Sequence, residues 1–123
     1  MRMMVVGGRE YKDQEFVFAI LDSFHETKPI TTLIHGGARG ADTLAGRWAD
    51  ARGVSVEEFF ADWEIYGRKA GPMRNARMIA DSRADALLVF PGGELTQDLK
   101  QRARLAGLPV YEPAPAKELA TTG

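Results

Sequence analysis

Four glycine-rich segments of this sequence contain the residue types that bind phosphate groups. The densest reads GGARGAD over residues 36–42, and the others lie at 7–9, 67–75 and 91–96. Glycine lets the backbone approach a ligand closely, and the free N–H groups at a helix N-terminus favour an anion. Five cationic side chains occur within these segments, namely Arg9, Arg39, Arg68, Lys69 and Arg74. Together they predict a pocket for a phosphorylated small molecule.

Acidic, aromatic and imidazole side chains in and beside these segments have more than one interpretation. Asp42 is either an acid favoured by the first turn of a helix or a group that takes part in chemistry. Trp63 and Tyr66 lie in a polar stretch and are candidates for a wall on which a base stacks. His35 fits a packed residue at a strand end better than a catalyst, and His25 is expected at the surface. The glycine spacing matches neither the dinucleotide fingerprint nor the Walker loop.

The elements that position these segments alternate between strand and helix. Apolar and β-branched runs predict strands at 3–6, 31–35, 54–60, 86–90 and 108–111. Four helices are predicted between them: one capped by Asp13, one ended by Gly53, one with Pro72 in its first turn and one ended by Gly107. This order predicts an α/β fold, a three-layer α-β-α sandwich with a parallel sheet of about five strands. Ligands of such sheets bind at the carboxyl ends of the strands, where all four glycine-rich segments lie.

The expected packing leaves one question open. Trp48 continues an apolar helical stripe and is expected in the core. Phe16 and Phe18 lie off the main stripe of the first helix, so they form either a second buried face or a contact between copies of the chain.

The composition excludes several functions. The formal net charge of −1 argues against an electrostatic grip on duplex DNA or on an anionic membrane. Without cysteine there are no disulfides and no thiolate metal sites, and two histidines leave little for a metal. No apolar run reaches the length of a signal peptide or a membrane span, so we expect a cytoplasmic protein without membrane contact. Residues 1–112 are expected to form one domain and 113–123 a flexible tail.

Several motifs together resemble a known family. GGARGAD at 36–42, ADW at 61–63, AGPMRN at 70–75 and FPGG at 90–93 are similar to the YspA-like domains of the SLOG superfamily of Rossmann-like proteins. The superfamily includes lonely-guy nucleotide phosphoribohydrolases, DNA-processing proteins of the DprA type that bind single strands, and sensors of nucleotide-derived signals. The resemblance implies a Rossmann-like fold, a nucleotide or nucleotide-sugar ligand, no separate cofactor, and a homo-oligomer.

The phosphoribohydrolase pattern is only half present. Arg74 matches the family's arginine, with Arg77 as a second candidate, and residues 91–93 match its Pro-Gly-Gly. In that family a Gly-Thr pair follows, and a glutamate three residues after the threonine acts in N-glycosidic cleavage. Here Leu95 replaces that glycine before the threonine.

The catalytic glutamate of that pattern is also replaced. Leu99 stands three residues after Thr96, and the nearest acid, Asp98, comes one residue earlier. Asp98, Asp42 or Glu94 would have to supply the missing acid, and we take Asp42, Arg74 and Asp98 as the candidate catalytic residues. Whether the protein is an enzyme stays open at this point.

We therefore expect a sensor or sequestering module that binds a nucleotide-derived small molecule: a nucleoside phosphate, an ADP-ribose-type molecule or a cyclic nucleotide signal. One alternative is a hydrolase that cleaves the N-glycosidic bond of a nucleotide. A lesser alternative is single-stranded nucleic-acid binding, against which the net charge argues. The expected ligand-binding residues are Gly7, Gly8, Arg9, Gly36, Gly37, Ala38, Arg39, Gly40, Asp42, Trp63, Gly71, Arg74, Asn75, Pro91, Gly92, Gly93 and Thr96.

Overall fold

A computed structural model of this chain describes residues 1–114. The elements are β1 (Arg2–Val6), α1 (Gln14–Thr27), β2 (Thr32–His35), α2 (Ala41–Arg52), β3 (Ser55–Glu58), α3 (Trp63–Tyr66), the 3-10 helix η1 (Gly67–Lys69), α4 (Ala70–Asp81), β4 (Ala86–Val89), α5 (Glu94–Leu105) and β5 (Val110–Tyr111). Every strand and helix predicted from the sequence is present. Of the expected tail at 113–123, residues 115–123 lie outside the described residues.

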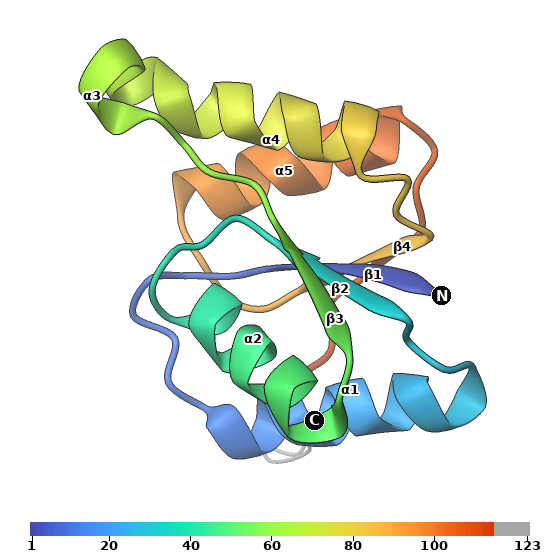
Figure 1. The fold of residues 1–123 in the computed structure, drawn as a ribbon. Helices are drawn as coiled ribbons and strands as arrows, with labels where there is room; N and C mark the ends of the chain where they lie inside the picture. Colours follow the sequence, from blue (N-terminus) through green and yellow to red (C-terminus); the bar gives the residue numbers. More distant parts are fainter. Residues whose placement is uncertain (115–123) are drawn as a thin grey trace, which may run out of the picture.

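The strands form one parallel sheet in the order β3-β2-β1-β4-β5. Helices α1 and α2 cover one face of this sheet, and α4 and α5 cover the other (Figure 1). The predicted three-layer Rossmann-like sandwich is therefore confirmed.

The sequence of β1 explains why the sheet is covered on both faces. Met3 and Val5 lie in the core shared with α1 and α2, whereas Met4 and Val6 lie in the core shared with α4 and α5. Successive side chains of a strand point to opposite faces, so a strand that is apolar at every position needs a layer on each side. Trp48 is fully buried in the first core, as predicted.

The helix ends mostly follow the predicted signals. The Asp13 carboxylate caps α1 by accepting from the Phe16 N–H at 3.1 Å, and Gly53 ends α2 in the left-handed region with φ +70°. The stretch between β3 and Pro72, expected as a loop, instead contains α3 and η1, and α4 begins at Ala70. A helix of four residues is too short to show an apolar stripe, so the capping residue Asp62 is the only sequence signal that indicates α3.

Three side chains of α1, those of Phe16, Phe18 and His25, are partly buried. His25 is half-buried rather than exposed: its Nδ1 accepts from the Ile30 N–H at 2.9 Å, and its ring meets Trp48 edge-on. Phe16 and Phe18 are partly buried against the core beneath α1 and α2, which supports the first of the two alternatives for these rings.

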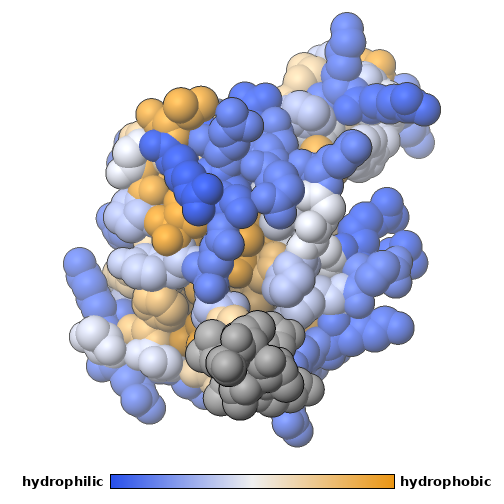
Figure 2. All heavy atoms as spheres, turned by 180° about the vertical axis from the view of Figure 1, so that it is seen from behind, coloured by the Kyte–Doolittle hydropathy of each residue, from blue (hydrophilic) through white to orange (hydrophobic). Residues whose placement is uncertain are grey.

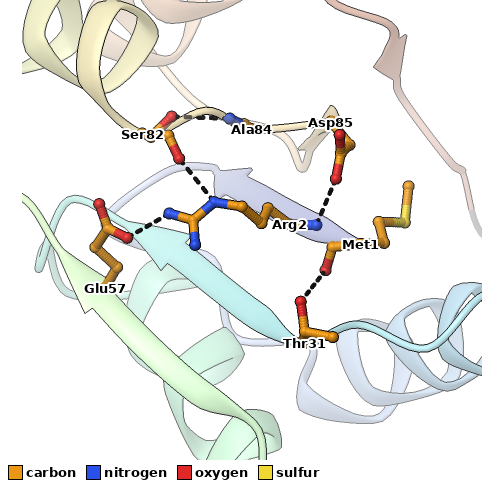
Figure 3. Close-up of polar contacts among 7 residues, drawn as sticks. All are labelled: Met1, Arg2, Thr31, Glu57, Ser82, Ala84 and Asp85. Atoms are coloured by element: carbon orange, nitrogen blue, oxygen red, sulfur yellow. Dashed lines mark hydrogen bonds and ion pairs between the residues drawn. The ribbon is translucent and has the colours of Figure 1, made fainter.

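Arg2 links several segments at the end of the sheet where the strands begin (Figure 3). Its Nε donates to the Ser82 carbonyl oxygen at 2.8 Å, and its guanidinium also bonds the Glu57 carboxylate. The Arg2 N–H donates to Asp85 Oδ2 at 2.8 Å. These contacts join β1 to β3 and to the loop before β4, at the opposite end of β1 from Gly7.

The surface is of mixed polarity. On the face shown in Figure 2, hydrophilic side chains project between smaller apolar patches. This agrees with a composition of 16 cationic and 17 anionic residues. Within residues 1–114, no helix combines the length and apolar character that crossing a membrane requires.

Candidate functional site

The direction in which strands are added reverses between β1 and β4, and the loops after these strands meet there. The Gly8 N–H donates to the Pro91 carbonyl oxygen at 2.7 Å, and the Gly8 carbonyl oxygen accepts from the Ala41 N–H at 3.2 Å. Gly40 has φ +79°, and a Cβ at this position would overlap the Gly8 carbonyl oxygen. Gly40 is therefore required by the close packing of the β2–α2 loop against the β1–α1 loop.

A cavity of about 930 Å³ opens beside these loops. Its volume lies within the range of small-molecule sites. The loops after β1, β2 and β4 contribute to its wall, together with α3, α4 and the first turn of α5. The lining residues are Val6, Gly7, Gly8, Arg9, Glu10, Gly36, Gly37, Ala38, Arg39, Asp42, Phe60, Ala61, Trp63, Arg74, Gly93, Glu94, Leu95 and Thr96.

In the loop between β2 and α2, backbone donors already have partners inside the chain. Asp42 Oδ2 accepts from the Gly36 N–H at 3.1 Å and from the Ala38 N–H at 3.2 Å. The Gly37 N–H donates to His35 Nδ1 at 2.9 Å. His35 is buried, and burial lowers the pKa of its imidazole. Three N–H groups expected to hold a phosphate therefore hold the loop itself in shape.

Asp42 combines burial with an unused acceptor. Its side chain is in the cavity wall, only 4% of the residue is exposed, and Oδ1 has no hydrogen-bond partner among residues 1–114. Burial raises the pKa of this carboxyl to about 6, although the hydrogen bonds from Ala38 and Gly36 and the charge of Arg74 act in the opposite direction. A carboxyl group that titrates near neutral pH in a cavity marks a candidate functional residue.

Arg74 lies on α4 and reaches the same loop from the other side. Its Nη1 donates to the Gly36 carbonyl oxygen at 2.8 Å, and its Nε donates to Asn75 Oδ1 at 3.0 Å. Burial lowers the pKa of the guanidinium, while the charge of Asp42 raises it. Arg74 thus lines the cavity and also supports the β2–α2 loop.

The N-terminus of α5 is suited to an anion. Gly93 is its N-cap residue, and no side chain of the described residues caps this helix. The N–H groups of a first helical turn have no acceptor within the helix, and the helix dipole favours negative charge there. Gly93 and the first three residues of α5 line the cavity, and a Cβ at Gly93 would meet nothing within 4 Å. This end of the cavity is therefore open as well as polar.

Two exposed aromatic side chains form another part of the cavity wall. Phe60 is 71% exposed and Trp63 is 51% exposed. The Arg77 guanidinium donates to the Phe60 carbonyl oxygen and so ties this segment to α4. Tyr66, the other predicted stacking residue, does not line the cavity. Phe60 was missed because it was assigned to the strand at 54–60, whereas β3 ends at Glu58.

Charges of both signs surround the cavity. Arg9 and Arg39 are exposed and line it, Arg68 lines a smaller cavity next to it, and Lys69 lines neither. The acids in the wall are Glu10, Asp42 and Glu94. In the described part of the chain, no three His, Asp or Glu side chains are grouped so that they would hold a metal ion.

Asp98 lies outside the main cavity. Its Oδ2 accepts from Asn75 Nδ2 at 3.0 Å and from Arg102 Nε at 2.8 Å. It lines the smaller cavity, of about 530 Å³, which shares Trp63, Glu94 and Leu95 with the larger one. The structure therefore separates Asp98 from Asp42 and Arg74.

Other predicted ligand-binding residues serve the packing around the cavity. A Cβ at Gly92 would overlap Thr96 Oγ1, and a Cβ at Gly71 would come within 2.5 Å of Leu95 Cδ2. The predicted residues that are absent from the cavity wall are Gly40, Gly71, Asn75, Pro91 and Gly92.

The strand order and the cavity at its switch point define a Rossmann-like α/β protein. The YspA, cpYpsA-related SLOG family matches residues 1–66 of the chain. The Gene 61 protein of Mycobacterium phage D29 is 39% identical over 117 residues, which cover 89% of this chain and 93% of that protein. The chain belongs to the YspA, cpYpsA-related SLOG family, in agreement with the resemblance of its motifs. Among solved protein structures, none matches it.

Proposed function

We propose that this protein binds a nucleotide-derived small molecule as a sensor or sequestering module. Membership of the SLOG family points to the binding or processing of nucleotide-related ligands. The ligand classes that fit are a nucleoside phosphate, an ADP-ribose-type molecule and a cyclic nucleotide.

The observation that carries this proposal is the cavity at the switch point, which is lined both by an uncapped helix N-terminus and by aromatic side chains. The N-terminus of α5 supplies N–H donors for a phosphate group. Arg9 and Arg39 add guanidinium groups, each of which can donate two parallel hydrogen bonds to a phosphate group. Phe60 and Trp63 offer apolar rings on which a base stacks.

Titration calorimetry against AMP, ADP-ribose and cyclic AMP tests this function. We expect at least one of them to bind, with an affinity that falls about tenfold or more in Arg39→Ala, because a hydrogen bond to a charged group is lost. Arg104→Ala is the matched control, since Arg104 is exposed and lies outside the cavity wall. Absence of binding by all three compounds would contradict the proposal.

A second candidate function is hydrolysis of the N-glycosidic bond of such a ligand, and the carboxyl of Asp42 favours it. A group whose pKa is about 6 can take up or release a proton near neutral pH. In this reaction water adds to the sugar carbon as its bond to the base nitrogen breaks, and a proton passes to the base. Asp42 would activate the water or stabilise the positive charge on the sugar.

Release of free adenine from AMP, followed by chromatography, tests this second candidate. If Asp42 acts as described, release stops in Asp42→Asn and continues in Asp98→Asn, because Asp98 is held by Asn75 and Arg102 outside the main cavity. If AMP binds to the wild-type protein and stays intact, the protein is a binding module for this compound.

A further inference from the structure

We propose that Asp42 accepts a hydrogen bond from a sugar hydroxyl group of the bound nucleotide, so that the cavity selects ribosyl over deoxyribosyl ligands. This inference rests on the proposed function. It identifies the part of the ligand that Asp42, in the first turn of α2, recognises.

The two oxygens of Asp42 have different surroundings. Oδ2 accepts from two backbone N–H groups, those of Gly36 and Ala38, whereas Oδ1 is buried and has no partner within the described part of the chain. Leaving a buried acceptor without a donor is costly, and such groups are rare in native proteins. Because Asp42 belongs to the cavity wall, a donor carried by the ligand can supply the missing hydrogen bond.

The surroundings of Asp42 favour a neutral donor over a phosphate. The N–H groups of the loop are already paired, and a carboxylate repels an anion, so the phosphate belongs at the α5 N-terminus instead. Arg74 already provides the positive charge near this carboxylate. A hydroxyl group donates a hydrogen bond without adding charge, and a ribose carries such groups between its base and its phosphate.

The test compares ligands that differ only in hydroxyl groups. Whichever of AMP, ADP-ribose and cyclic AMP binds most tightly is titrated calorimetrically, followed by its 2′-deoxy analogue and, if its 3′-hydroxyl is free, its 3′-deoxy analogue, against the wild-type protein, Asp42→Asn and Asp50→Asn. In Asp42→Asn the amide oxygen can still accept from the Gly36 and Ala38 N–H groups, so the loop keeps its support. Asp50 is exposed on the same helix and provides the matched control.

We expect the wild-type protein and Asp50→Asn to lose about tenfold or more in affinity when one hydroxyl is removed. We expect Asp42→Asn to discriminate between the same two ligands by less, so that the effects of variant and ligand are not additive. Equal affinity of the wild-type protein for ribosyl and deoxyribosyl ligands overturns the inference, as does an equal loss for both ligands in Asp42→Asn. If Asp42→Asn does not fold, the wild-type ligand series still decides. Failure of every nucleotide to bind would instead refute the proposed function.

Discussion

Asp42 and Arg74 hold the two polar backbone groups of the same residue, Gly36. Asp42 Oδ2 accepts from the Gly36 N–H at 3.1 Å, and Arg74 Nη1 donates to the Gly36 carbonyl oxygen at 2.8 Å. The two side chains come from α2 and α4, which lie on opposite faces of the sheet. A Cβ at Gly36 would come within 2.5 Å of Arg74 Nη1, so the glycine is required by this clamp. The shape of the cavity wall therefore depends on both helices.

Replacement of Arg74 by methionine is expected to destabilise the protein by about 2–4 kcal/mol, because Asp42 and the Gly36 carbonyl oxygen lose their buried partner. The free energy of unfolding in urea measures this loss. At pH 7.5, where Asp42 is charged, Arg74→Met is expected to cost less stability in the Asp42→Asn background than in the wild-type protein. Strict additivity would show that the two side chains do not interact.

The pH dependence of stability should report the buried carboxyl of Asp42. Its pKa is about 6 in the folded protein, against 3.8 as its ordinary value, so the folded state binds the proton more tightly. Its stabilising contribution is therefore complete below about pH 4 and is lost as the pH rises through 6. Asp42→Asn is expected to be more stable than the wild-type protein at pH 7.5, by up to about 3 kcal/mol, and this difference should shrink toward pH 4.

Unfolding curves of both proteins at several pH values check this expectation. Arg74 on α4, Glu58 on β3 and His35 on β2 are charged or titratable groups near Asp42 and are present in both proteins. Asp22, whose pKa is lowered to about 2 chiefly by its hydrogen bond from Arg52, has the opposite pH dependence. It also occurs in both proteins, so it cancels in the difference. A difference that is constant from pH 4 to 7.5 would contradict the assigned pKa.

A carboxylate placed at Gly93 should separate folding from ligand binding. Gly93→Asp supplies the missing cap of α5, so the free energy of unfolding is expected to be unchanged or to rise by about 0.3 kcal/mol. The same carboxylate occupies the first-turn N–H groups and repels a phosphate, so nucleotide affinity should fall about tenfold or more. Gly93→Asn is the neutral counterpart and should weaken binding less. Calorimetry of both variants makes the comparison, and equal losses would rule out a phosphate at this end.

Arg2 provides a test at the opposite end of the strands from the cavity. Arg2→Met removes the side-chain hydrogen bonds to the Ser82 carbonyl oxygen and to Glu57 and should destabilise the protein by about 1–2 kcal/mol. Nucleotide affinity should stay the same, because these contacts lie away from the cavity. Thermal unfolding and calorimetry measure the two effects. A marked loss of nucleotide affinity would mean that contacts at the amino-terminal ends of the strands affect the cavity at their carboxyl ends.

Much of the fold could be predicted because short sequence patterns indicate where its strands and helices begin and end. The apolar run at 3–6 requires cover on both faces, Asp13 caps α1, and Gly53 ends α2. The position of the cavity also follows from the sequence, since three of the four glycine-rich segments, at 7–9, 36–42 and 91–96, come directly after strands. By contrast, α3 has too few residues for a detectable period, and Phe60 follows an edge strand whose end no residue marks.

The roles of individual residues within the cavity required the tertiary structure. From the sequence, the glycines at 36–42 and the five cations describe one phosphate pocket, and Asp98 and Asp42 are equivalent acids. Folding pairs the loop N–H groups with Asp42 and His35, ties Asp98 to Asn75 and Arg102, and leaves the N-terminus of α5 uncapped. Residue type determines which hydrogen bonds a group can make. Which of them are already made depends on contacts between residues far apart in the chain, and those contacts exist only once the sheet and its helices have packed.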